Sequence, residues 1–206
     1  MDLRLGVHDP YRSMRMIASA RRWFAIKQTH MKKIVLTYGI IGGIIVSAIM
    51  WLTLGSGEHD FDNGMWIGYT TMVIALSTIF FAVKTYRDKH LGGSIKFGKA
   101  FLMGLYITLL ASTMYVASWM VLSANSKQDF MQAYYEHEKA KLESSDMPAA
   151  EVESKLLEMR EFGEMYKNPV VKVGFTYMEI LPVGLLISLI CAAILMRREA
   201  VGDSRT

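Results

Sequence analysis

The sequence predicts an all-α protein, an integral membrane four-helix bundle with an extracytoplasmic helical hairpin between spans 3 and 4. Three observations support this prediction. Four apolar runs are each long enough to cross the roughly 30 Å hydrocarbon core of a bilayer. The segments that flank these runs alternate between basic and acidic, and such an asymmetry orients membrane helices. One connector is much longer than a link between neighbouring helices requires.

The composition fits a single membrane-embedded domain. Apolar residues make up 52% of the 206 residues and are gathered in long runs, which is unlike a chain of soluble domains. The formal net charge of +4 hides a segregation of basic from acidic segments, so a nucleic-acid partner is not needed to explain it. The single cysteine, Cys191, lies inside the last apolar run, which excludes an intrachain disulfide and a Cys/His metal cluster.

The four spans are predicted at about residues 34–54, 65–83, 100–122 and 170–196. The first span follows Lys32 and Lys33, whereas the connector after it, residues 58–64, contains no lysine or arginine. Basic residues flank the next connector, and Arg197 and Arg198 follow the last span. Because cytoplasmic loops are enriched in lysine and arginine, we expect both termini in the cytoplasm.

The connector at about residues 124–169 should have structure of its own, and its pattern predicts two helices, one at about 128–143 and one from about residue 148. In the second helix, one face carries the apolar or small residues Val152, Leu156, Met159, Gly163 and Tyr166. Such a helix is amphipathic, and its apolar face has to be covered. We therefore expect this hairpin to bind a membrane or envelope protein partner.

Residues 1–30 form a basic N-terminal extension to the membrane domain at residues 31–199, and residues 200–206 form a short tail. Basic residues interspersed with large apolar ones are typical of a helix that lies on an anionic lipid surface. Alternatively, Met31 is the true start of translation, because Met31-Lys32-Lys33 followed by an apolar run resembles a natural N-terminus. The sequence leaves both interpretations open.

Glu179 is the main candidate for a functional residue. At about 1.5 Å rise per residue it lies roughly 14 Å from Val170 along the fourth span, near the bilayer midplane. An ionised carboxylate there is costly, so we expect it to be protonated, paired or hydrated. Pro182, three residues later, predicts a kink beside it. Lys172, seven residues earlier and on the same face, is a candidate counter-charge.

Two interpretations of Glu179 follow. In the first, it is the proton or cation site of a small oligomeric transporter or ion pathway, with the hydroxyls of the third span as co-ligands: Thr108, Ser112, Thr113 and Tyr115. In the second, a neutral carboxyl group forms a hydrogen bond across helices, which contributes about 0.6–2 kcal/mol. The spans contain no second acid, histidine or arginine that would make a proton relay.

Small residues mark predicted helix contacts. Gly39 and Gly43 form a G-x-x-x-G pattern in the first span, and Gly184 lies in the fourth. Such residues let helices approach closely. The sequence does not decide whether the helix against Gly39 and Gly43 belongs to the same chain or to a second copy in a homo-oligomer.

Catalytic and metal-binding signatures are missing from the sequence. Glu58, His59, Asp60 and Asp62 are too few and too irregularly spaced for a calcium loop, so we interpret them as a solvated topology signal. His137 is interpreted as a surface histidine. Since no nucleophile motif, zinc motif or phosphate loop occurs, we expect no enzyme activity, no catalytic residue, no metal and no cofactor.

Residues 31–199 resemble a family of small four-span bacterial membrane proteins known as domain of unknown function 4199. The resemblance rests on YGIIGG at residues 38–43, SIKFGKAF at 94–101, the long polar insertion, and LPVGLLISLI at 181–190. It implies the bacterial inner membrane, with lipids as neighbours, and supplies no activity or ligand. We therefore expect a non-enzymatic structural or partner-binding membrane component, with the Glu179 transporter as the alternative.

Overall fold

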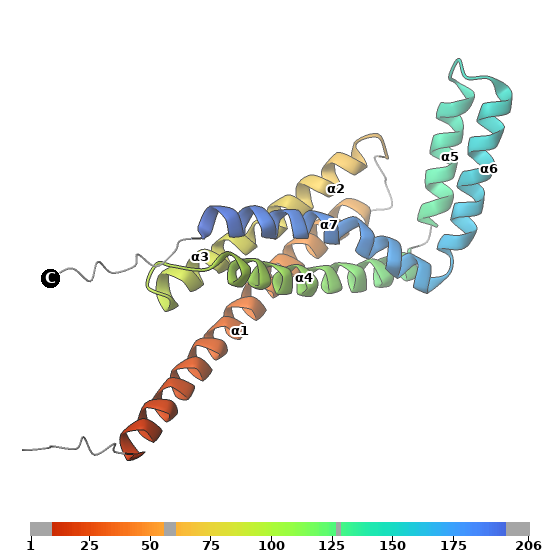
Figure 1. The fold of residues 1–206 in the computed structure, drawn as a ribbon. Helices are drawn as coiled ribbons and strands as arrows, with labels where there is room; N and C mark the ends of the chain where they lie inside the picture. Colours follow the sequence, from red (N-terminus) through yellow and green to blue (C-terminus); the bar gives the residue numbers. More distant parts are fainter. Residues whose placement is uncertain (1–9, 56–60, 127–128, 197–206) are drawn as a thin grey trace, which may run out of the picture.

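The structure, a computed structural model, describes residues 10–55, 61–126 and 129–196, with side chains from Gln28 onward. The described residues are almost entirely helical (Figure 1). The helices are α1 (Pro10–Leu54), α2 (Phe61–Leu76), α3 (Thr78–His90), α4 (Phe97–Asn125), α5 (Phe130–Glu143), α6 (Ala149–Tyr166) and α7 (Pro169–Leu195).

The four predicted spans are confirmed as helices of sufficient length and apolarity to cross a membrane. They cover Gln28–Leu54, Phe61–His90, Phe97–Asn125 and Pro169–Leu195. The second consists of α2 and α3, which meet at Ser77. The Ser77 backbone remains helical, with φ −60° and ψ −18°, and its hydroxyl donates to the Ile74 carbonyl at 2.6 Å. The interruption is therefore a local tightening rather than a turn.

The bundle packs most closely where small residues face each other. A Cβ atom built on Gly104 of α4 would lie 2.7 Å from the Ser188 hydroxyl oxygen of α7. That hydroxyl donates to the Gly184 carbonyl at 2.7 Å and lies 3.3 Å from the Thr108 hydroxyl. Because apolar burial gives little drive between helices in lipid, close contacts and hydrogen bonds of this kind hold spans together.

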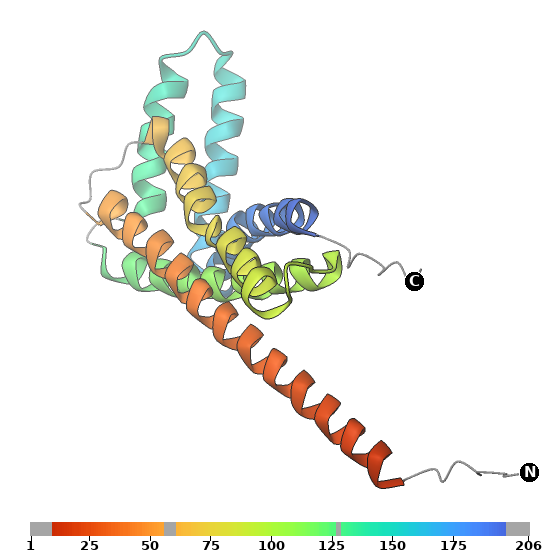
Figure 2. The same cartoon turned by 90° about the vertical axis from the view of Figure 1, so that its left-hand side faces the viewer.

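The predicted hairpin between spans 3 and 4 is present as α5 and α6. Asp129 caps α5, since its carboxylate accepts from the Met131 and Gln132 amides at 2.8 and 3.2 Å. The hairpin projects sideways from the end of α4 and α7 and stands beside the far end of α2 (Figures 1 and 2). Val152 and Leu156 of α6 line a cavity with residues of α5, so the apolar face of α6 turns toward its own hairpin partner.

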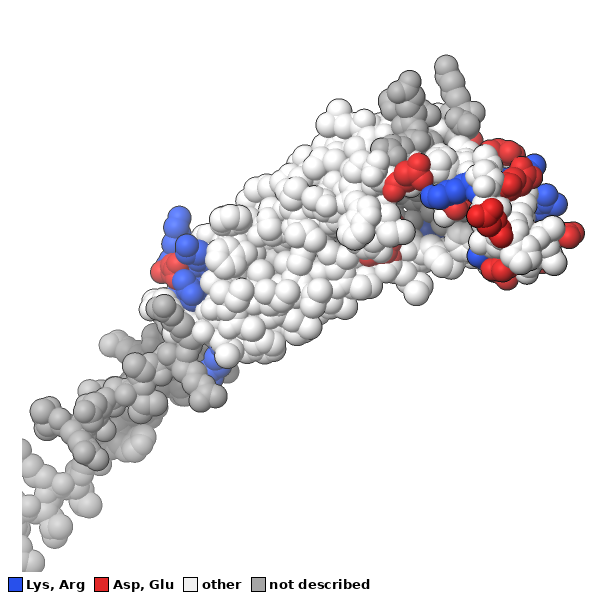
Figure 3. All heavy atoms as spheres, turned by 90° about the horizontal axis from the view of Figure 1, so that it is seen from above, with Lys and Arg blue, Asp and Glu red and all other residues white. Residues whose placement is uncertain are grey.

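Charge separates the two ends of the bundle. Figure 3 shows a white band of residues other than Lys, Arg, Asp and Glu, with mainly lysine and arginine at one end, and with most of the acidic side chains, together with some basic ones, at the other. We call the first the basic end; it carries Arg87, Lys89, Lys96 and Lys99. The second, which carries the α5–α6 hairpin, is the acidic end. His30 of α1 stacks on His90 of α3 with ring centroids 4.5 Å apart, which places this part of α1 at the basic end.

The N-terminal extension is continuous with the first span, because α1 runs without interruption from Pro10 to Leu54. The start of translation at Met31 stays a prediction. Several residues of the sequence analysis lie outside the described part of the chain: Glu58, His59, Asp60, Arg197 and Arg198.

Candidate functional site

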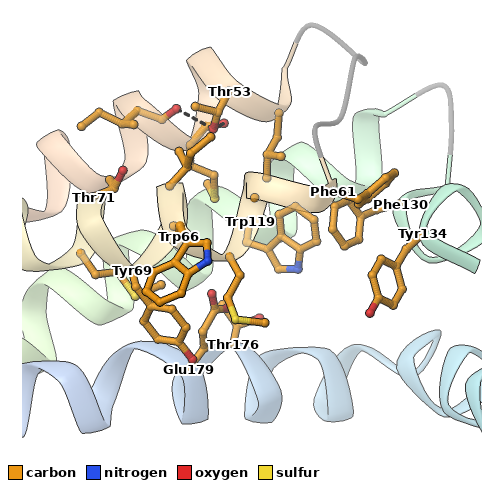
Figure 4. A pocket seen from close by; sticks show the side chains of 18 of the residues that line it. Thr53, Phe61, Trp66, Tyr69, Thr71, Trp119, Phe130, Tyr134, Thr176 and Glu179 are labelled. Carbon is orange, nitrogen blue, oxygen red and sulfur yellow. Dashed lines mark hydrogen bonds between the residues drawn. The ribbon is translucent and has the colours of Figure 1, made fainter. Parts of the chain in front are cut away.

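The candidate site is a cleft of about 760 Å³ at the acidic end. It is lined by residues of α1, α2, α4 and α7, and residues of the α5–α6 hairpin complete its lining. Glu179, the main candidate from the sequence, is exposed and lines this cleft. In Figure 4, Trp66 and Tyr69 extend from α2 toward α7, the helix that carries Thr176 and Glu179.

The cleft has an aromatic wall with few polar groups. The aromatic lining residues are Phe61, Trp66, Tyr69, Tyr115, Trp119, Phe130, Tyr134, Phe162 and Tyr166. Gly64 and Gly68 of α2 also line it, and a Cβ atom built on either would meet nothing within 4 Å. The space is open because α2 presents small and outward-facing residues here; its buried residues begin only at Met72.

Glu179 makes no hydrogen bond or ion pair with any residue that the structure describes. The predicted counter-charge, Lys172, points elsewhere. Its ammonium donates to the Ser123 hydroxyl at 3.4 Å and lies 5.4 Å from the centre of the Tyr166 ring. Lys172 and Glu179 are seven residues apart, which puts both on one face of α7. The Lys172 side chain nevertheless extends toward α4 and α6 rather than along α7 toward Glu179.

The hydroxyls predicted as co-ligands are divided between two places. Tyr115 lines the cleft with Glu179. Thr108 is buried against Ser188, Ser112 is fully buried, and Thr113 accepts a hydrogen bond from the Tyr177 hydroxyl at 3.0 Å. The structure therefore brings only Tyr115 of this set to the cleft, together with Thr71 and Thr176, which the sequence analysis did not single out.

The hairpin is fixed to α2 at the mouth of the cleft. The Asp62 carboxylate accepts from the Lys141 ammonium at 3.0 Å and lies 3.4 Å from the His137 ring nitrogen. This hydrogen bond raises the pKa of Lys141 above its usual range. Beside it, the Phe61 ring packs edge-on against Phe130, with ring centroids 5.6 Å apart. His137 is therefore a contact between α5 and α2.

A second contact fixes the hairpin to α4. The Trp119 indole donates to the Tyr166 hydroxyl at 2.9 Å, and Trp119 packs edge-on against Phe130 at 5.3 Å. Phe162 of α6 packs edge-on against Phe175 of α7 at 5.0 Å. Together with the contact to α2, these contacts tie α5 and α6 to three different helices, so the hairpin, which forms the roof of the cleft, is held in place at several points.

The remaining predicted residues are packing residues outside the cleft. Gly39 and Gly43 of α1 face Leu110 and Met114 of α4, so their helix partner lies within the same chain. Gly184 faces Thr108. Pro182 lies inside α7, which continues through it and changes direction along its length in Figure 1.

The cleft offers little to a metal ion. Among the residues that the structure describes, no group of three or more His, Cys, Asp and Glu side chains is arranged to hold one. The aromatic wall from α2 was missed by the sequence analysis, which singled out neither Trp66 nor Tyr69. A usable signal was the pair Gly64 and Gly68 beside Trp66 and Tyr69, since small and aromatic residues alternate there.

Comparison with protein families gives one match. The model of the family described as protein of unknown function DUF4199 matches residues 37–197, more than half of the chain. The chain belongs to the DUF4199 family. No curated protein and no solved structure matches it. The matched region begins within α1 and ends just after α7, so for this DUF4199 protein it includes most of the first span, the three other spans, the hairpin and every residue of the cleft.

Proposed function

We propose that this DUF4199 protein is a non-enzymatic component of the bacterial inner membrane, with both termini in the cytoplasm and the hairpin outside. The basic end supports this orientation, because lysine and arginine are concentrated on the cytoplasmic side of membrane proteins. Cysteines introduced one at a time at Lys96 and at Ser145 of the hairpin test it. A membrane-impermeant thiol reagent added to intact cells should label only the cysteine at position 145. Labelling of position 96 alone would reverse the orientation.

We further propose that the protein binds a molecule with an apolar body in the cleft. The cleft itself carries this proposal: its volume of about 760 Å³ lies in the range of roughly 300–1,000 Å³ that small-molecule sites occupy. An aromatic wall with a few polar groups is also the usual lining of such a site.

A neutral fluorescent probe, N-phenyl-1-naphthylamine, tests cleft binding in the purified chain. We expect a saturable rise in probe fluorescence that Gly68→Leu removes, because the leucine fills open space in the cleft without a clash. Gly174→Leu is the matched control, since Gly174 also has open space around it and does not line the cleft. An equal signal from all three proteins would mean that the probe dissolves in the micelle, and would overturn the proposal.

The α5–α6 hairpin is a second candidate binding site. We propose that it binds a membrane or envelope protein partner. Val152 and Leu156 line a cavity with residues of α5, so the support now comes from the exposed apolar residues of α6, Leu157 and Met165, which are 56% and 55% exposed. Photocrosslinking residues at these two positions should join the hairpin to another polypeptide, and the same residue at Val152 should not. Crosslinks only within the chain, from all three positions, would remove the support.

Transport is the alternative function, and the position of Glu179 favours it. An ionisable residue inside a span that lines a cleft is where a proton or cation pathway is expected. Reconstituted protein should then show proton- or cation-coupled flux that disappears in Glu179→Gln. Binding in the cleft without any flux would assign the protein a binding role only.

A further inference from the structure

We infer that the ligand of the cleft is a lipophilic organic cation, with the Glu179 carboxylate as its counter-charge. This inference rests on the proposed binding function of the cleft. It adds the sign of the charge on the ligand and names the residue that interacts with this charge.

The first argument is the unmatched carboxylate. Glu179 has no hydrogen bond or ion pair to any other described residue, and the two lysines near the cleft have other partners. Lys172 is directed to Ser123 and Tyr166, and Lys141 is bonded to Asp62. An ionised carboxylate at this depth is costly unless it is paired or hydrated, and the described part of the chain places no positive charge beside it.

The second argument is the charge of the whole lining. The described lining residues include three acids, Asp62, Glu138 and Glu179, and one base, Lys141. With all four ionised, the cleft has two more negative than positive charges. Low-dielectric walls focus such a field and raise the local concentration of cations. An anionic amphiphile would instead meet repulsion at the mouth and at Glu179.

The third argument concerns the kind of cation. A hard metal ion needs about six oxygen ligands, and the described residues contain no cluster of that kind. The wall facing Glu179 carries Trp66 and Tyr69 (Figure 4), and aromatic faces attract organic ammonium and similar cations. A cation whose charge is spread over an apolar body loses little hydration on entry, so it suits a cleft that is lined by aromatic residues and contains Glu179.

The experiment uses two probes of nearly the same shape and opposite charge, tetraphenylphosphonium and tetraphenylborate. Both are titrated into the purified full-length protein in mild detergent, and binding is measured by calorimetry against protein-free micelles. We expect saturable binding of the phosphonium, and Glu179→Gln should weaken it by at least about 10-fold. Glu161→Gln, an exposed acid of α6 outside the cleft lining, should leave the affinity unchanged.

Gly68→Leu is the second variant, because it fills the cleft and keeps the carboxylate. It should abolish phosphonium binding while Glu179→Gln only weakens it. Thermal unfolding of each variant shows whether it remains folded.

The possible outcomes distinguish a failure of the cation inference from a failure of the proposed ligand binding in the cleft. Equal phosphonium affinity in Glu179→Gln and the parent chain, or tetraphenylborate binding as tight as phosphonium binding, would overturn the cation inference and leave cleft binding standing. Failure of both charged probes and of the neutral naphthylamine would overturn the two together.

Discussion

Gly184→Ala is the sharpest test of how the bundle is held together. A Cβ atom at this position would meet the Thr108 side chain, with its hydroxyl oxygen at 2.7 Å and its Cβ at 3.0 Å. Thr108 and Gly184 lie in the middle of α4 and α7, so the two helices would have to separate, and overpacking of this kind costs about 1–3 kcal/mol. The alanine also gains up to about 1 kcal/mol of helix propensity, which partly masks that cost.

Gly174→Ala on the same helix isolates the packing cost, because a Cβ atom there meets nothing within 4 Å. The propensity gain is common to both variants, so their difference in free energy of unfolding should be the overpacking cost alone, about 1–3 kcal/mol. Reversible unfolding in mixed micelles of dodecyl sulfate and mild detergent, followed by tryptophan fluorescence, measures it. Adding Thr108→Ala should recover part of the loss in Gly184→Ala, as expected for residues in contact. Equal stability of the two glycine variants would refute the packing described for α4 and α7.

Three further predictions concern the roof of the cleft and the core. Asp62→Asn removes the carboxylate that raises the pKa of Lys141, so that pKa, followed by NMR, should fall toward the ordinary value. Because the pKa is raised, the ion pair is complete at neutral pH and is lost only as the pH rises through that raised pKa; an unchanged titration would contradict the contact. Tyr166→Phe leaves the Trp119 indole without its acceptor and should lower the free energy of unfolding by about 1–2 kcal/mol. Ser112→Ala should raise it by about 1 kcal/mol, because that hydroxyl is buried with no partner among the described residues.

Matched controls distinguish these effects from general damage. Tyr177→Phe also removes a tyrosine hydroxyl, but its bond to Thr113 is exposed, so it should change the free energy of unfolding by less than about 0.5 kcal/mol. Ser188→Ala removes a buried hydroxyl that donates to Gly184 and should destabilise the protein, the opposite of Ser112→Ala. The same sign for both serine variants would contradict the hydrogen bonding described.

The four spans and the hairpin could be predicted from the sequence because both follow from local composition. A run of about 20 apolar residues and a polar insertion with helical periodicity need no knowledge of the other helices. The tightening at Ser77 was not predicted, since a serine in an apolar run carries no local signal that its hydroxyl will bond to Ile74. The continuity of α1 through residues 10–54 was missed for a similar reason, because a change in composition at residue 31 does not end a helix.

The site was predicted only in part. Glu179 was recognisable because an acid in an apolar run is rare, and the cleft does contain it. Its surroundings depend on which face of each neighbouring helix turns toward α7, and spacing along one helix cannot supply this. Thus Lys172, on the expected face, bonds to Ser123, while Trp66 and Tyr69 come from a helix more than 100 residues away in the chain.

The two ends of the bundle differ in how closely the spans approach each other. Toward the basic end, small residues are buried among larger core side chains such as Tyr86 and Met103; the small ones include Ala82, Ala100, Gly104, Ser188 and Ala192. Close approach there is favoured because contacts and hydrogen bonds are the main attraction between helices in lipid. Toward the acidic end, the positions around the cleft carry large rings, which keep the helices apart and are bridged by the hairpin. The bundle is therefore closely packed toward the basic end and contains a cleft lined by aromatic residues toward the acidic end, and Glu179 lies in the wall of that cleft.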